Sequence, residues 1–219
     1  GGNRSYCASV TPSSSPLAEA VVSRNNIVDT KCFSFINALS ETYDAKSQIS
    51  PSHSKKVTEC AVALAKSLKL EPSQVSRLEA CALLHDIGKI GISDIILNKS
   101  DGLAAAETEE IKKHPQIGAD IISRIPQLAA CAGGILHHHE CFDGSGYPDG
   151  LKGEDIPLEA RIIAIADTFV SMTCERPPSE NLTVEQAMVE LKQCSGRLFD
   201  PSLVEEFISS YKVGVNLKK

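Results

Sequence analysis

The sequence predicts an all-α domain, a helical bundle of about eight or nine helices. Apolar residues recur at helical spacing along most of the chain, whereas no useful length of sequence shows the apolar–polar alternation of a β-strand. The 219 residues are 42% hydrophobic but contain no Trp, and aromatic residues make up only 5%. The core should therefore be aliphatic, and the length suits one medium domain.

The expected helices of the first half are separated by polar breaks that carry helix-opening residues. Residues 1–26, which contain the run TPSSSP, are expected to be a linker or N-terminal remnant, and the domain is expected to span 27–219. The helices expected here are 27–43, one opened by Pro51 or Ser52 with His53 at its start, one opened by EPSQ that runs into His85-Asp86, and a short piece near 93–97.

The second half contains the most hydrophobic helix, Leu158–Met172, which is expected to be buried on several sides. Thr183 with Gln186 resembles a capping box, and Asp200-Pro201 is a good N-cap and first-turn pair. The helices expected in this half are 107–113, 115–125, 126–136, 158–172, 183–194 and 201–211.

Charge and cysteine usage narrow the function classes. The net charge of −6 argues against sequence-independent binding of DNA or RNA, which needs a basic face. No apolar run approaches the ~20 residues of a membrane span, so no membrane contact is expected from this domain. The eight cysteines are scattered without a C-x-x-C pair. They are expected to be reduced thiols in a cytoplasmic protein rather than a disulfide framework.

Histidines and aspartates in apolar surroundings suggest a metal site. The stretch HHHECFDGSGYP, residues 137–148, places three histidines before a Gly-rich loop. His85-Asp86 follows the apolar helix face ACALL, and Asp167 lies inside IIAIADTFV with no Lys or Arg one turn away. Such groups are costly to bury without a counter-charge, so a shared metal is the economical explanation. A lone histidine such as His53 is, by contrast, more often an ordinary surface or core residue.

Imidazoles combined with carboxylates suit iron, manganese or zinc, and the lack of thiolates in the cluster disfavours a structural zinc site. The candidate ligands exceed what one metal usually takes, so two metals that share Asp86 are expected. Paired metals lie about 3.5–4 Å apart and clamp a phosphorus during an in-line displacement. Lys89, one turn beyond His85, is placed to neutralise a phosphate oxygen, the alternative being a plain solvated lysine.

Five segments, in order along the chain, resemble the HD-GYP family, the metal-dependent phosphodiesterases of the HD superfamily that open cyclic di-GMP. The resemblance extends over roughly residues 30–210. A generic HD hydrolase of nucleotides would share the HD pair and a later Asp but would lack the double His with the GYP loop. The segments are HDIGKIG (85–91), KKHPQIG (112–118), HHE-x-x-DGSGYP (138–148), G-x-x-IPLEARIIAIAD (153–167) and FDPSLVEEF (199–207).

The resemblance implies an HD-superfamily helical bundle with a dinuclear metal site, and it implies roles for particular residues. Asp86 and Lys89 would be catalytic, and Lys89 and Arg176 would contact substrate phosphate. The GYP loop, Gly146-Tyr147-Pro148, would pack near the site, bind substrate and contact GGDEF-type cyclase domains. His137 falls outside the pattern. The implied metal ligands are His53, His85, Asp86, His114, His138, His139 and Asp167.

Three positions depart from the family's pattern. Ile49 stands where some members have the Glu that binds a third metal, so two metals are expected. Val170 replaces the usual Asp of the D-x-x-D-A-L stretch. Ser179, followed by Glu180, replaces the second basic residue after Arg176. Loss of that cation should weaken phosphate binding by one charge-assisted hydrogen bond, about 1.5–3 kcal/mol in a dry site.

The expected activity is hydrolysis of cyclic di-GMP to pGpG, with GMP as a further product, by a metal-bridging hydroxide. Two divalent metal ions are the expected cofactors, iron or manganese first, with zinc, magnesium or nickel as alternatives. Two other functions stay open: a signalling module that binds the nucleotide or a cyclase partner and cleaves little, and a phosphodiesterase for cyclic GMP-AMP. The expected partners are a cyclic dinucleotide and GGDEF-domain proteins, with homodimerisation left open.

Overall fold

The computed structural model describes residues 34–41, 52–99, 102–173 and 181–216, with side chains up to residue 211. This part of the chain is helical, including 34–41, and an isolated bridge between Ser195 and Phe199 is its only strand-like pairing. The all-α prediction is confirmed. The α-helices are α3 (His53–Ser67), α4 (Pro72–Leu84), α5 (Asp94–Leu97), α6 (Ala105–Ile111), α7 (His114–Ser123), α8 (Ala132–Leu136), α9 (Leu158–Thr173), α10 (Val184–Gln193) and α11 (Pro201–Asn216), and the 3₁₀ helices are η1 (Ile87–Gly91), η2 (Ala129–Cys131) and η3 (Gly153–Asp155).

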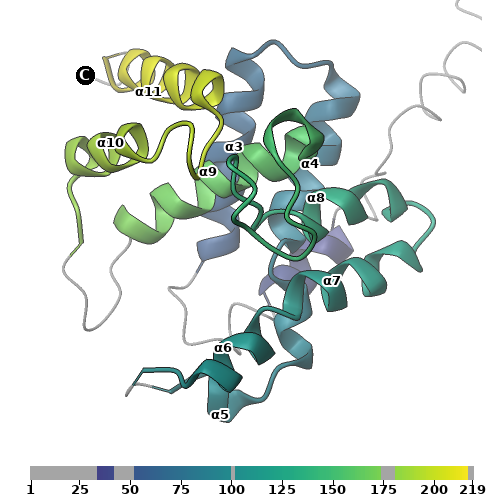
Figure 1. Ribbon diagram of the computed structural model, residues 1–219. Coiled ribbons are helices and arrows are strands. Elements are labelled where there is room, and N and C mark those ends of the chain that lie inside the picture. Colours follow the sequence, from purple (N-terminus) through teal and green to yellow (C-terminus); the bar gives the residue numbers. More distant parts are fainter. Residues whose placement is uncertain (1–33, 42–51, 100–101, 174–180, 217–219) are drawn as a thin grey trace, which may run out of the picture.

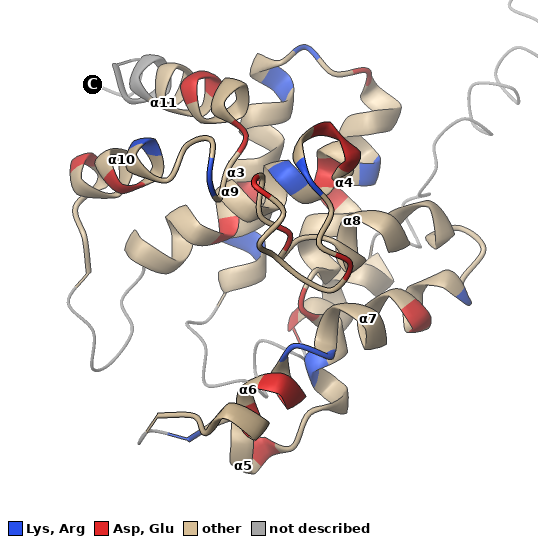
Figure 2. Ribbon diagram, in the orientation of Figure 1, with Lys and Arg blue, Asp and Glu red and all other residues tan. Residues whose placement is uncertain are grey.

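The helices form a bundle in which α9 is the central element (Figure 1). It packs against α3, α4, α8, α10 and α11. The short helices α5 and α6 lie at the edge of the molecule opposite α11 (Figure 1). Acidic and basic residues are interspersed along the helices in the same view (Figure 2). No helix in the described ranges is long and apolar enough to cross a membrane.

Helix ends follow the capping signals in the sequence. Pro72 occupies the first turn of α4, and the Glu71 backbone N–H donates to Gln74 Oε1 at 3.1 Å. At α10 the Gln186 N–H donates to Thr183 Oγ1 at 3.3 Å, and the Thr183 N–H donates to Gln186 Oε1 at 2.8 Å. These reciprocal bonds satisfy N–H groups that a helix start leaves without partners. The capping box predicted at Thr183 is confirmed.

The aliphatic core is built around α9, whose Ile162, Ile163 and Ile165 have no exposed surface. Because these three positions point in different directions around the helix, α9 is buried on several sides, as predicted. Phe169 adds an aromatic edge contact, with its ring centroid 5.1 Å from that of Phe207. Because α9 is held on several sides, the direction in which it presents the Asp167 side chain is fixed by the surrounding helices.

Two partly buried ion pairs join α9 to the start of α11 and to α4. Arg161 Nη1 lies 2.6 Å from Asp200 Oδ2, and Arg77 Nε lies 2.6 Å from Glu159 Oε1. Asp200 also accepts a hydrogen bond from the Ser202 N–H at 2.9 Å, so it caps α11 as predicted. The carboxylate therefore serves both as a helix cap and as the partner of Arg161.

The helix predicted at 126–136 is wrong in its first part. The chain instead makes tight turns, with Leu128 N bonded to Ile125 O and Cys131 N bonded to Leu128 O, both at 2.8 Å, before the short α8. Pro126 has no N–H to continue the helical hydrogen-bond pattern, and the next α-helix begins only at Ala132. Conversely, α11 extends beyond the predicted residue 211 to Asn216.

The backbone of η1 lies directly against the start of α7. A Cβ atom added at Gly88 would be 1.9 Å from the His114 carbonyl oxygen and 2.5 Å from Gly118 N. Glycine is the residue that permits this approach, because any side chain would have to displace backbone. The contact holds the His85-Asp86 segment beside His114.

We predict that Gly88→Ala lowers the free energy of unfolding by about 2 kcal/mol or more, because α7 must shift away from η1. Gly133→Ala is the matched control: its added Cβ would meet only Pro157 Cγ at 3.9 Å. That control should change stability by less than about 1 kcal/mol, since alanine favours a helix. Urea unfolding of both variants measures the difference, and equal stability of the two proteins would contradict the prediction.

Candidate metal centre

The structure brings together the seven residues that the sequence suggested as metal ligands, from five separate elements. Neighbouring imidazole rings have centroids 5.9 Å (His53–His85), 5.3 Å (His85–His138), 5.3 Å (His114–His138), 5.1 Å (His114–His139) and 4.1 Å (His138–His139) apart. Asp86 and Asp167 contact this cluster of rings through their carboxylates. The elements are the first residue of α3, the α4–η1 junction, the first residue of α7, the segment after α8, and α9.

The ligand atoms fall into two groups that share Asp86. The first ligand group is Asp86, His114, His138 and His139, the second is His53, His85 and Asp86, and within each the ligand atoms lie within 4.8 Å of one another. Asp86 Oδ1 is 3.3 Å from His114 Nε2, whereas Oδ2 is 3.5 Å from His85 Nε2. The two oxygens of one buried carboxylate thus face the two groups. This is the arrangement expected of a carboxylate that bridges two cations.

Asp167 joins the cluster through His53. Its Oδ1 lies 3.0 Å from His53 Nε2, and its side chain is 23% exposed, so it is less buried than its apolar helix suggested. The missing Lys or Arg partner is replaced by an imidazole from a residue 114 positions away. Asp167 therefore extends the second ligand group at its open side.

The ends of three helices orient three of these imidazoles. Each Nδ1 lies close to the carbonyl oxygen of the residue three positions earlier, in the last turn of the preceding helix. A carbonyl can only accept, so each Nδ1 carries the hydrogen and each Nε2 directs its lone pair into the cluster. These carbonyls would otherwise lack helical partners. The bonds are His85–Ala82 at 2.8 Å, His114–Ile111 at 2.8 Å and His138–Ile135 at 2.6 Å.

The donor geometry fits a bound metal. His114 Nε2 and His138 Nε2 lie 3.3 Å apart, and both are acceptors because their Nδ1 atoms carry the hydrogens. Two lone pairs at this distance repel unless a cation lies between them. His85 Nε2 is buried and has no hydrogen-bond partner among the described residues. Nitrogen and oxygen donors without thiolates suit iron, manganese or zinc.

Burial keeps the imidazoles of His138 and His139 neutral and ready to bind a metal. It lowers the pKa of His139 to about 4, and it lowers the pKa of His138 well below its ordinary value of 6.5. Neighbouring imidazoles act in the same direction, because each opposes a second positive charge nearby. At neutral pH both rings therefore have a free lone pair on one nitrogen.

The two carboxylates stay charged, although Asp86 is buried and Asp167 is partly buried. Burial alone would raise the pKa of Asp86, but nearby positive charge, above all that of Lys89, outweighs it and holds that pKa well below its usual value. Burial likewise opposes ionisation of Asp167, yet the hydrogen bond from His53 and nearby positive charge lower its pKa to about 2. The cluster thus combines two anions with the neutral imidazoles of His138 and His139, a set that attracts divalent cations.

Lys89 is part of the cluster rather than a solvated surface residue. Its Nζ lies 2.6 Å from Asp86 Oδ2, and its side chain is 17% exposed. The 3₁₀ helix η1 places it one turn after the His85-Asp86 pair. A cation held at this point lies beside the same oxygen that faces the second ligand group.

In the loop 139–150, Tyr147 packs on the cluster of candidate ligands. The Tyr147 ring stacks on His139, with centroids 4.9 Å apart and ring planes inclined by 20°. A Cβ added at Gly146 would be 2.2 Å from Cys141 N, so the loop closes on its own backbone at a point that only glycine allows. The predicted position of the GYP loop beside the site is what the structure shows.

Glu140 organises this loop, a role that was not predicted from the sequence. Its side chain is fully buried, and Oε1 accepts hydrogen bonds from Asp149 N at 2.8 Å and Gly150 N at 3.1 Å. Its place directly after the histidine pair was the available signal, but a sequence does not show which N–H groups a carboxylate will meet. His137 Nδ1 lies 3.7 Å from Glu140 Oε1 and belongs to neither ligand group.

Four of the positions discussed from the sequence, Ile49, Arg176, Ser179 and Glu180, lie outside the described residues. Val170, which replaces an Asp in the family's pattern, is buried with 3% exposure. It belongs to the hydrophobic core, where an uncompensated carboxylate would be costly. A valine is therefore suited to this position.

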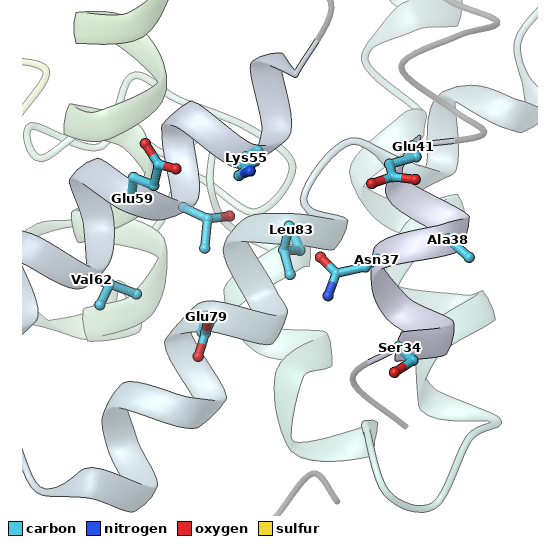
Figure 3. A pocket seen from close by; sticks show the side chains of 10 residues that line it. Ser34, Asn37, Ala38, Glu41, Lys55, Glu59, Val62, Glu79 and Leu83 are labelled. Atoms are coloured by element: carbon cyan, nitrogen blue, oxygen red, sulfur yellow. The ribbon is translucent and has the colours of Figure 1, made fainter. Parts of the chain in front are cut away.

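A cavity of about 680 Å³ lies elsewhere, between residues 34–41, α3 and α4 (Figure 3). It is lined by none of the seven candidate ligands. Glu41, Glu59 and Glu79 face it together with Lys55. This excess of negative charge disfavours an anionic ligand in the cavity. The cluster of candidate metal ligands is therefore the better candidate site for phosphate chemistry.

We predict that the metal-free protein loses stability as the pH falls from about 6.5 to about 4. The folded-state pKa of His139 is about 4, below its ordinary value of 6.5, so the unfolded chain takes up the proton first and acid favours unfolding. This difference corresponds to about 3 kcal/mol for His139 alone. Urea unfolding in the presence of a chelator measures it, and His139→Gln should flatten the profile. Unchanged stability across this range would contradict the prediction.

Known proteins match the chain over most of its length. The HD domain family model matches residues 27–203. The cyclic di-GMP phosphodiesterase response regulator RpfG of Xanthomonas campestris is 42% identical over 158 residues, covering 70% of this chain and 41% of the relative. The 3'3'-cGAMP-specific phosphodiesterase 2 of Vibrio cholerae is 38% identical, covering 76% and 32%. The chain thus spans less than half the length of these two relatives.

The solved structure of Bd1817, an HDG"Y"P protein from Bdellovibrio bacteriovorus, shares the fold. Its TM-score is 0.62 at 21% identity, and the match covers 89% of this chain and 67% of that one. The ligand cluster, the loop stacked on it and the matches to known proteins agree. The chain belongs to the HD domain family.

Proposed function

We propose that this chain is a metal-dependent phosphodiesterase domain that hydrolyses cyclic di-GMP to pGpG, with GMP as a further product. The observation that carries the proposal is the pair of ligand groups that share the buried carboxylate of Asp86. Relatives named as cyclic di-GMP phosphodiesterases support the choice of substrate. Hydrolysis of a phosphodiester is the reaction for which paired metals are suited.

Two divalent metal ions are proposed as the cofactors, with iron or manganese preferred and zinc, magnesium or nickel as alternatives. When bound, they would supply Lewis-acid activation and neutralise negative charge on the phosphodiester. The first ligand group would hold one ion and the second, extended by Asp167, the other. The ionised Asp86 would contribute to both, since its two oxygens face the two groups.

Lys89 and Tyr147 have complementary roles in the proposal. Lys89 Nζ, beside Asp86, is positioned to meet negative charge that develops on a phosphate oxygen in the transition state. Tyr147 covers the His139 ring and restricts its motion. Arg176 is retained as a substrate-binding residue from the family resemblance alone, as it lies outside the described residues.

Cyclic GMP-AMP is the second candidate substrate, because a relative at 38% identity carries that specificity in its name. A module that binds cyclic dinucleotides and cleaves little is the remaining alternative. Contacts of Gly146-Tyr147-Pro148 with GGDEF-domain proteins and homodimerisation are also proposals. A cytoplasmic location is proposed because the described cysteines are free thiols, as a reducing compartment would keep them.

The metal content of variants tests the two ligand groups. Wild-type protein should bind about two metals per chain, His53→Ala about one, and Asp86→Asn fewer than one, because Asp86 serves both groups. Elemental analysis of protein purified under reducing conditions gives the count. His137→Gln is the matched control and should keep two metals, as His137 lies in neither group. Equal loss of metal in His53→Ala and Asp86→Asn would contradict the prediction that Asp86 contributes to both metal sites.

Turnover on a panel of cyclic dinucleotides tests the activity. Metal-loaded protein should convert cyclic di-GMP to pGpG, and Lys89→Ala should lower kcat by about 100-fold, the effect of losing one charged transition-state donor. The metal content of that variant should not fall. Chromatography of the products from cyclic di-GMP, cyclic GMP-AMP and cyclic di-AMP gives the rates. Metal-loaded protein that cleaves none of them would show that the proposed function is wrong.

A further inference from the structure

Lys112 lies beside the loop 139–150, whose Tyr147 stacks on the candidate ligand His139. It follows the last residue of α6, two positions before His114 (the basic segment between α6 and α7 in Figure 2). Its Nζ lies 5.7 Å from the centroid of the Tyr147 ring, and Tyr147 in turn stacks on His139. The contacts therefore run from a candidate metal ligand through an aromatic ring to a lysine at the surface. Lys112 has no role in the proposed hydrolysis at the metal ligands.

The charge of Lys112 is only loosely held. Its ion pair with Glu109, 2.6 Å long, joins side chains that are 40% and 67% exposed. Water screens such a pair, so an anionic ligand can replace Glu109 at small cost. Lys89 differs in this respect, because its partner Asp86 is only 5% exposed and is needed within the cluster. Lys112 is thus a cation near the site that can change partners.

We propose that Lys112 binds the second, uncleaved phosphate of a cyclic dinucleotide, an inference that rests on the proposed function. Such a substrate carries two phosphodiesters. When one lies at the ligand cluster beside Lys89, the other must remain outside it. Lys112 is a cation just outside the cluster, separated from the candidate ligand His139 by the Tyr147 ring. A lysine donates strongly to a phosphate oxygen. Lys112 would thereby favour cyclic dinucleotides over compounds with a single phosphodiester.

The test compares Lys112→Ala with Lys113→Ala. Lys113 is the matched control: it is the next residue, makes the same type of ion pair with Glu110 at 2.5 Å, and is 61% exposed. With cyclic di-GMP, Lys112→Ala should raise KM by about 10-fold and leave kcat within about 2-fold, the loss of one charge-assisted contact at a partly exposed site. Lys113→Ala should match wild type, and Lys112→Arg should restore KM.

A substrate with one phosphodiester, bis(4-nitrophenyl) phosphate, separates the two phosphate positions. Its KM should be the same for wild type and Lys112→Ala, because it has no second phosphate for the lysine to contact. An equal rise in KM for both substrates would overturn the assignment to the uncleaved phosphate. Equal effects of Lys112→Ala and Lys113→Ala would overturn it as well, since they would indicate general electrostatics.

Equilibrium binding gives a readout that does not depend on turnover. A phosphorothioate analogue of cyclic di-GMP that resists hydrolysis should bind Lys112→Ala with a Kd about 10-fold higher and with weaker salt dependence. If wild type binds or cleaves cyclic di-GMP and Lys112→Ala does so equally well, this inference alone is wrong. If wild type neither binds nor cleaves any cyclic dinucleotide, the proposed function is wrong and the inference with it.

Discussion

The buried carboxylate of Asp86 is the constraint on which the rest of the structure depends. An anion with 4% exposure is costly to bury unless positive charge or hydrogen-bond donors surround it. Lys89 lies beside it, and its two oxygens face the two ligand groups, where bound cations would add positive charge. The α4–η1 junction must therefore lie close to α7, and the glycine at position 88 makes that approach sterically allowed.

The same helix ends build both the fold and the site. A helix leaves its last carbonyls without internal partners, and α4, α6 and α8 each give one to the Nδ1 of a histidine three residues later. Stability and function are coupled as a result. The bonds that satisfy the helix ends also choose the tautomer that directs Nε2 into the cluster. Disturbing one of these helix ends would misdirect a ligand as well as weaken the helix.

The charge near the ligand cluster, rather than the net charge of the chain, decides whether an anionic substrate is attracted there. The chain has a net charge of −6, which repels a nucleotide at long range. Near the cluster, however, Lys89 and Lys112 supply positive charge, and bound metal ions would reverse the local field. The glutamates facing the cavity between α3 and α4 have the opposite effect there. Local charge thus favours the ligand cluster with bound metals over this cavity as the site for an anion.

The sequence by itself determined the all-α class, most helix positions and the capping of α10, because helical periodicity and caps are local properties. It also singled out His85, Asp86 and Asp167, since such groups in apolar runs need compensation. The family resemblance added His53 and His114 to the candidate ligands. It failed in the first part of 126–136, where tight turns after Pro126 replace the expected helix.

Tertiary structure decided what depends on distant partners. Asp167 meets His53 from 114 residues away, Glu140 binds the N–H groups of its own loop, and Lys112 lies over Tyr147. Such contacts depend on how helices pack and loops close, because residues far apart in the chain become neighbours only when the core is assembled.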